Sequence, residues 1–104
     1  MSPTESSRTY KLTPRARADL EDIWRHTAKT WSIDQADAYL AGIAATFDTL
    51  ADMPGVGRLH REFTPPVRLH VHRSHLIIYQ DTSHGIDIIR VLHMRQDWKG
   101  ILDG

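Results

Sequence analysis

The chain has 104 residues and no cysteine, and it balances thirteen Lys and Arg against thirteen Asp and Glu. This length fits one domain around a single core, and the lack of cysteine excludes disulfides, thiolate nucleophiles and thiolate metal sites. A net charge of zero gives no strong field for nucleic acid, and no stretch approaches the roughly 18 apolar residues of a membrane span. We therefore expect a disordered N-terminus at residues 1–8, then a single cytoplasmic domain at residues 9–104.

The first half of the chain predicts one strand and two helices. Residues 9–12 are a strand candidate, and Thr13 and Pro14 supply the cap and first turn of a helix. Ser32 and Gln35 have the spacing of a capping box, so a second helix begins there and ends at residues 53–55. Because so few residues separate the helices, they must form an antiparallel hairpin.

The second half predicts a small sheet. Residues 55–66 are rich in Pro and Gly and read as loop, with a short extended piece around 59–63. Residues 67–72 alternate apolar and polar side chains, which is typical of a strand covered on one face. Residues 75–80 and 86–93 carry consecutive apolar side chains, as do central strands covered on both faces. The turn at 81–85 joins them into a hairpin.

Together these elements predict an α+β fold in the order β-α-α-β-β-β, with the helical hairpin packed on one face of a small, mostly antiparallel sheet. A short C-terminal turn or helix at residues 96–102 is expected to cover the other face with Trp98, Ile101 and Leu102.

A characteristic set of residues recurs in a fixed order between Tyr10 and Asp97. It comprises Leu12, Ala16, Asp19-Leu20, Ile23, Trp31, Gln35-Ala36, Tyr39, Phe47, Leu50, Pro54, Gly57-Arg58, Arg68, His75, Ile78, Tyr79, Ile88, Arg90-Val-Leu-His93 and Asp97. In this succession the chain resembles the ParE branch of the RelE/ParE toxin superfamily.

The resemblance implies the toxin of a type II toxin-antitoxin pair, held in a hetero-oligomer by a small ParD-like antitoxin. The ParE branch is understood to act on DNA gyrase by binding, with no established catalytic residues. The resemblance thus implies no cofactor, no membrane partner and no sequence-specific DNA binding by the toxin alone.

The RelE branch shares the fold but cuts messenger RNA in the ribosome, which requires groups for acid-base catalysis and cations for the phosphorane. Here Arg68, Arg90, His93, Glu62 and His60 have that chemistry. The lysines that usually cluster on a RelE-type sheet are missing, because Lys11, Lys29 and Lys99 all lie outside the predicted three-strand region. The sequence thus favours a gyrase-binding protein, with a ribosome-dependent endoribonuclease as the alternative.

The exit of the last strand carries the candidate target contacts, since a buried strand presents polar groups on a rigid base. They are Arg90, His93, Arg95, Gln96 and Asp97, of which the last three are expected to be exposed. An equally open interpretation makes Arg90 a structural arginine paired with Asp87, Glu62 or Asp97, and His93 a packing residue.

Apolar residues on the helices are the candidate antitoxin contacts, because an amphipathic antitoxin segment needs aromatic anchors. They are Leu20, Trp24, Tyr39, Ile43 and Phe47. Most of this set is expected to form the core, with Trp24 and Tyr39 also reaching a partner.

Histidine is the remaining ligand type. His70 and His72 share one face of their strand and could bind zinc with a third ligand from His75, His93 or Glu62. No spacing fixes that third ligand, so no metal site is predicted. His26, His60 and His84 are expected to face solvent.

Overall fold

Two hydroxyl side chains start the helices, as predicted. The Thr13 hydroxyl oxygen accepts from the backbone N–H of Ala16 at 3.1 Å, and that of Ser32 accepts from Gln35 at 3.0 Å. In this computed structural model, which describes residues 9–103, the helices they cap are α1 (Pro14–Thr30) and α2 (Ile33–Asp52). Residues 1–8, for which disorder is predicted, lie outside the described part.

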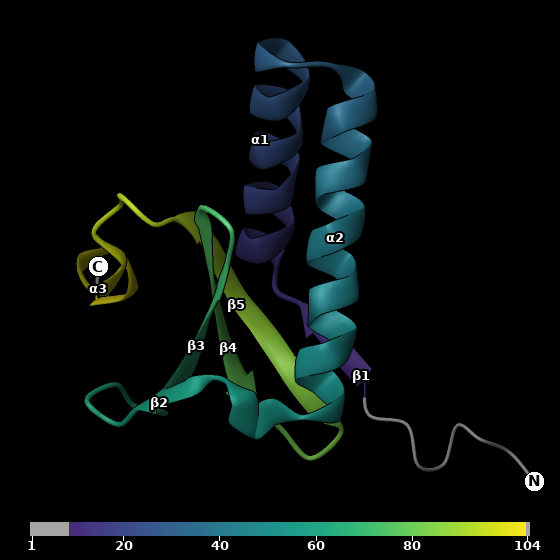
Figure 1. Ribbon diagram of the computed structural model, residues 1–104. Helices are drawn as coiled ribbons and strands as arrows, with labels where there is room; N and C mark the ends of the chain where they lie inside the picture. The colour runs from purple at the N-terminus through teal and green to yellow at the C-terminus, as the bar shows by residue number, and fades with distance from the viewer. Residues whose placement is uncertain (1–8, 104) are drawn as a thin grey trace, which may run out of the picture.

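The helices form an antiparallel hairpin that stands on one face of the sheet, while a short helix lies on the other side (Figure 1). The remaining elements are β1 (Thr9–Leu12), η2 (Pro54–Val56), β2 (Arg58–His60), β3 (Val67–His72), β4 (His75–Asp81), β5 (Gly85–His93) and α3 (Trp98–Asp103). The predicted element order is confirmed, and the extended piece expected around 59–63 is the shorter edge strand β2, which begins one residue earlier and ends three residues earlier. None of the helices within residues 9–103 is long and apolar enough to span a membrane.

The five strands lie in the order β1-β5-β4-β3-β2. Only the β1–β5 pair is parallel, so the prediction of a mostly antiparallel sheet is confirmed. A register shift between Ile78 and Tyr79 of β4 leaves Ile89 as an extra residue on β5, which is a β-bulge. β1 ends where Leu12 pairs with Ile88, so β5 continues past the bulge without a strand on that side.

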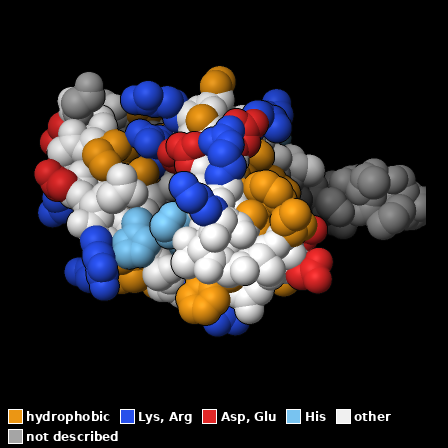
Figure 2. Space-filling model, turned by 90° about the horizontal axis from the view of Figure 1, so that it is seen from above, with side chains coloured by type: hydrophobic (Ala, Val, Ile, Leu, Met, Phe, Trp, Pro, Cys, Tyr) orange, Lys and Arg blue, Asp and Glu red, His pale blue; other side chains and the backbone are white. Residues whose placement is uncertain are grey.

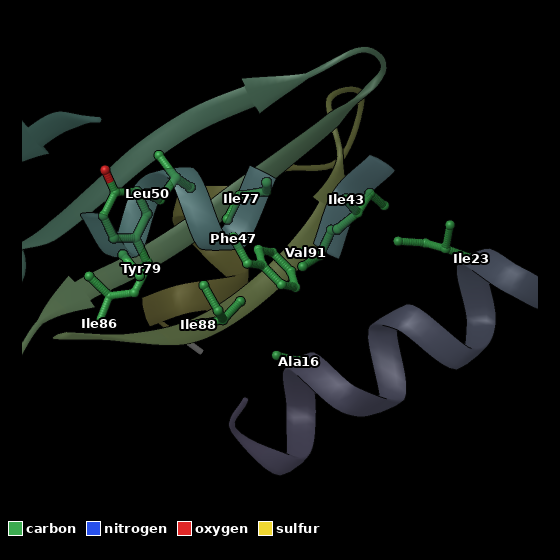
Figure 3. Close-up of a cluster of buried hydrophobic side chains, with 11 residues drawn as sticks. Ala16, Ile23, Ile43, Phe47, Leu50, Ile77, Tyr79, Ile86, Ile88 and Val91 are labelled. Carbon is green, nitrogen blue, oxygen red and sulfur yellow. The ribbon is translucent and has the colours of Figure 1, made fainter. Parts of the chain in front are cut away.

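The central strands are covered on both faces, as their consecutive apolar residues predict. Beneath the hairpin, β4 and β5 contribute Ile77, Tyr79, Ile86, Ile88 and Val91 to the main core (Figure 3). The opposite face forms a second cluster, which α3 covers. Its α3 members, Trp98, Ile101 and Leu102, are the three predicted residues.

β3 departs in part from its predicted pattern. Val67 is buried and Leu69 packs on the second cluster, but Val71 is 49% exposed. The face that the pattern predicts to be exposed to solvent lies toward α2, where His72 contacts Thr46. The alternation of apolar and polar side chains separates the two faces of a strand, but it does not show which element of the fold packs on each face.

A buried phenol anchors the loop that follows α2. The Tyr79 hydroxyl donates to the Pro54 carbonyl at 2.6 Å and accepts from the Gly57 N–H at 2.9 Å. Arg68 donates to the Gly57 carbonyl and to Asp81, both at 3.0 Å. Burial raises the pKa of Tyr79, so the hydroxyl stays protonated and keeps both roles.

We expect Gly57→Ala to destabilise the fold by about 1–3 kcal/mol, because a Cβ there would lie 2.1 Å from the Tyr79 hydroxyl oxygen. Gly55→Ala is the matched control, since its Cβ would meet nothing within 4 Å. Urea unfolding of both variants measures the difference. Equal unfolding midpoints would contradict the steric argument.

Candidate protein-binding groove

A groove of about 1030 Å³ runs between the helical hairpin and one end of the sheet. Its walls come from α1, the hairpin tip, α2, the β3–β4 turn and the exit of β5. Figure 2 views this end of the molecule and shows two histidine side chains side by side there. The groove brings side chains from both helices and from the end of the sheet around one hollow, so it is the candidate binding site.

Three histidines at the sheet end form a cluster, here called the histidine cluster: His72, His75 and His93. The register of the sheet brings them together, because His72 pairs with His75 across β3–β4 and His75 pairs with His93 across β4–β5. The His75 and His93 rings lie 5.4 Å apart in an edge-to-face arrangement. Tyr39 of α2 covers the cluster, with its ring centroid 5.7 Å from His72 and 5.4 Å from His75.

Each ring of the cluster uses its Nδ1 atom in a hydrogen bond. The Thr46 hydroxyl donates to the Gly42 carbonyl, so its oxygen accepts from His72 Nδ1–H at 3.0 Å. His93 Nδ1 accepts from the Arg95 backbone N–H at 3.1 Å. The 2.6 Å bond between Tyr39 and His75 Nδ1 fits a phenol that donates to a neutral imidazole.

The cluster disfavours positive charge. Burial, and after it the neighbouring His93, His72 and His26, lowers the pKa of His75 to about 4. Burial, followed by Arg73 and His70, also lowers the pKa of His72. Among residues 9–103 the ion pairs made by histidine are His60–Glu62 and His84–Asp87, both outside the cluster. At neutral pH the groove floor at His72 and His75 is therefore aromatic and uncharged.

An ion pair closes the same groove beside the cluster. Arg90 donates to both carboxylate oxygens of Asp19 at 2.8 and 2.9 Å, and the Val91 N–H donates to Asp19 at 2.9 Å. The two side chains are only 17% and 13% exposed, and the bonds to Asp19 raise the pKa of Arg90. The prediction that Arg90 pairs with Asp87, Glu62 or Asp97 was wrong, because α1 packs along the edge of β5 beyond the end of β1.

The five candidate target contacts divide into two groups. Arg90 is held by Asp19 and His93 is half-buried in the cluster, whereas Arg95, Gln96 and Asp97 are exposed as predicted. Gln96 accepts from the His93 backbone N–H at 2.8 Å, and Asp97 caps α3 through the Gly100 N–H at 3.2 Å. Arg95 thus lies at the surface directly after β5, next to residues that hydrogen bonds hold in place.

The structure divides the RelE-type candidates among three separate places. Arg90 and His93 line the groove, Arg68 lies at the loop after α2, and Glu62 pairs with His60 and Lys99 beside α3. His60 was expected to face solvent, but its ring packs edge-on against Trp98 at 5.2 Å. His26 and His84 are exposed as predicted.

The candidate antitoxin contacts lie mostly in the core. Ile43 and Phe47 are 0% and 1% exposed, and Leu20 packs against the same core. Trp24 is half-buried and donates to Asp37 at 2.9 Å. Tyr39 is the member of this set that lines the groove.

Sequence reasoning missed the hairpin tip, and it considered His72, His75 and His93 together only as possible metal ligands. Trp31 is 72% exposed and Ile33 is 61% exposed, and Trp31 also lines the groove. The tight turn at Ser32 could have indicated the exposed tip from the sequence, because the residues beside a turn between two helices lie away from the sheet. No group of three His, Cys, Asp or Glu side chains within residues 9–103 is placed to hold a metal ion.

Comparison with known proteins gives a consistent result. Residues 10–98 match the family model described as ParE toxin of the type II toxin-antitoxin system parDE. A Toxin ParE1 of Mycobacterium tuberculosis is 41% identical over 92 residues, which is 88% of this chain and 94% of that protein. A Toxin ParE1 of Caulobacter vibrioides is 36% identical over 84 residues, covering 81% and 86% of the two chains.

A solved structure shares the fold. It is a chain described as a chromosomal ParDE TA system from P. aeruginosa, with a TM-score of 0.72 and 21% identity. The match covers 86% of this chain and 99% of that one.

We expect Asp19→Ala to lower the free energy of unfolding by about 3 kcal/mol, because it leaves the Arg90 guanidinium partly buried without its carboxylate. Asp22→Ala is the matched control, since its pair with Arg25 is exposed and is worth about 0.5 kcal/mol. Denaturant titration compares the two variants. Similar losses would show that the Asp19 pair adds nothing beyond a surface contact.

The stability of the protein should fall as the pH drops from 6.5 toward 4, because the unfolded chain binds a proton at His75 that the folded chain excludes. His75→Asn keeps an acceptor for Tyr39 and should flatten this dependence. His84→Asn, which alters an exposed histidine paired with Asp87, should leave it unchanged. Urea midpoints measured across this pH range test the sign, and a slope that His75→Asn does not reduce would contradict it.

Proposed function

Because the chain belongs to the ParE toxin family of type II toxin-antitoxin systems, we propose that it inhibits DNA gyrase and that a ParD-like antitoxin neutralises it. The observation that carries the proposal is the open groove of about 1030 Å³, which has the exposed side chain of Trp31 at its tip. The toxin then acts by binding, in the cytoplasm, where gyrase works on the chromosome, and it requires no cofactor.

The scattered RelE-type residues support binding over catalysis. An RNA-cleaving site needs an acid, a base and free cations around one phosphate. Arg68 and Arg90 each donate to a carboxylate, and Glu62 lies beside α3, away from the groove that Arg90 lines. No observation therefore favours the endoribonuclease alternative.

The groove suits an amphipathic antitoxin segment. Trp31 offers a large exposed aromatic surface at one end, and Tyr39 with the uncharged histidine cluster forms an aromatic floor at the other. Aromatic anchors of this kind contribute most of the energy of a protein interface. The structural relative from P. aeruginosa is described as a ParDE system, which supports a ParD-type occupant and a hetero-oligomer here.

The groove also suggests how the antitoxin neutralises the toxin. His93 and Gln96 line its end, and Arg95 lies between them in sequence at the exit of β5. If this exit contacts gyrase, a segment seated in the groove covers part of the target surface. One occupant then excludes the other by direct competition.

We expect the purified toxin to inhibit gyrase supercoiling and to leave messenger RNA in a translating extract intact. Arg95→Ala should weaken inhibition by roughly tenfold, the effect of losing one charged contact at an interface. Arg17→Ala, an exposed arginine of α1, is the matched control and should retain inhibition. Deleting the chain from Arg95 onward is a poorer test, because it also removes α3 and uncovers the second cluster.

Cleaved messenger RNA together with unaffected gyrase would contradict the proposal and favour the RelE-type endoribonuclease. Equal inhibition by Arg95→Ala and wild-type toxin would instead remove the β5 exit from the gyrase contact.

A further inference from the structure

The histidine cluster is placed where a partner must cover it. His72, His75 and His93 line the groove from three neighbouring strands, and Tyr39 covers them from α2. A segment seated in the groove would remove more water from these rings. Removing water disfavours the charged form of an imidazole unless an acid is supplied.

The surroundings of His75 supply no acid. The groups that face it are Tyr39 from α2, His72 and Arg73 from β3 and its turn, His93 from β5 and His26 from α1. These groups are neutral, cationic or able to become cationic. A proton added to one ring of the cluster therefore raises the cost of adding the next.

Three carboxylates line the groove, but two of them already accept hydrogen bonds from arginines. Asp19 accepts from Arg90 at 2.8 and 2.9 Å, and Asp22 accepts from Arg25 at 2.8 Å. Asp34 lies in the first turn of α2, at the hairpin tip and away from the sheet end that carries the cluster. The cluster itself thus has no anionic counterpart among residues 9–103.

Two hydrogen bonds of the cluster, those made by His93 and His75, also need neutral rings. His93 Nδ1 can accept from the Arg95 N–H only while that nitrogen carries no proton. His75 Nδ1 receives the Tyr39 hydroxyl in the same way. Protonation at these atoms would disturb the floor of the groove and the first residues of the β5 exit.

Apolar side chains beside the cluster point to an apolar occupant. Ile23, Val91 and Leu92 line the groove and are at most 9% exposed, and Trp31 extends this surface to the hairpin tip. An apolar segment covers neutral histidines at little cost, whereas it cannot stabilise their charged forms.

We propose that the groove binds the apolar face of the antitoxin only while the histidine cluster is uncharged, so that acidification releases the antitoxin from the toxin. This inference rests on the proposed function of the groove. Binding then excludes protons from the cluster, and by linkage each excluded proton weakens binding by about tenfold per pH unit below the pKa of the free toxin.

The test measures the dissociation constant of the toxin with a full-length ParD-like antitoxin, at constant ionic strength, between about pH 7.5 and about pH 3.5, because the pKa of His75 in the free toxin is about 4. Wild-type toxin should bind roughly fourfold more weakly at the acid end. The double variant His72→Asn/His75→Asn keeps a donor for Thr46 and an acceptor for Tyr39 but cannot be protonated there. It should show a much smaller pH dependence, while His84→Asn should behave as wild type.

The outcomes separate the two proposals. Affinity that stays constant with pH, or that changes equally in wild type and the double variant, would overturn the proton linkage and leave the antitoxin groove standing. Tighter binding in acid would also overturn it, since it would mean that the antitoxin brings a carboxylate to the cluster. No binding of the wild-type toxin at pH 7.5 would contradict the proposed function itself. Circular dichroism of each toxin at each pH confirms that the folded protein is being compared.

Discussion

The contact of the Asp19 carboxylate with β5 is the interaction on which the site depends. β1 ends at Leu12, so the next part of β5 would present an unpaired edge. α1 supplies the missing partners: the Thr13 hydroxyl donates to the Ile89 carbonyl at 2.9 Å, and Asp19 accepts from Val91 N–H and from Arg90. These bonds hold the foot of the hairpin on the sheet, and the space between hairpin and sheet end becomes the groove.

The strands below the groove determine which side chains form its floor. Antiparallel pairing aligns His72, His75 and His93 at one end of the sheet, and Tyr39 reaches them because α2 crosses above. Burial among groups without negative charge keeps this floor neutral. The polar histidines thereby form an aromatic surface in the groove, and protonation of their rings would change its charge.

Arginines that would have to meet a phosphate in a nuclease instead stabilise the fold, Arg90 through Asp19 and Arg68 through Asp81. The residues left at the surface, the hairpin tip at Trp31 and the β5 exit at Arg95, are suited to protein contacts. Trp31 lines the groove, and Arg95 lies in the sequence between His93 and Gln96, which also line it.

By itself the sequence determined the helices, their caps, the doubly covered strands and the covering role of Trp98, because periodicity and capping are encoded within a few neighbouring residues. It also carried the family resemblance. Only the tertiary structure decided that Arg90 pairs with Asp19, 71 residues away, and that three strand ends place their histidines together. Such contacts depend on where β1 stops and on strand register, which no local pattern of side chains specifies.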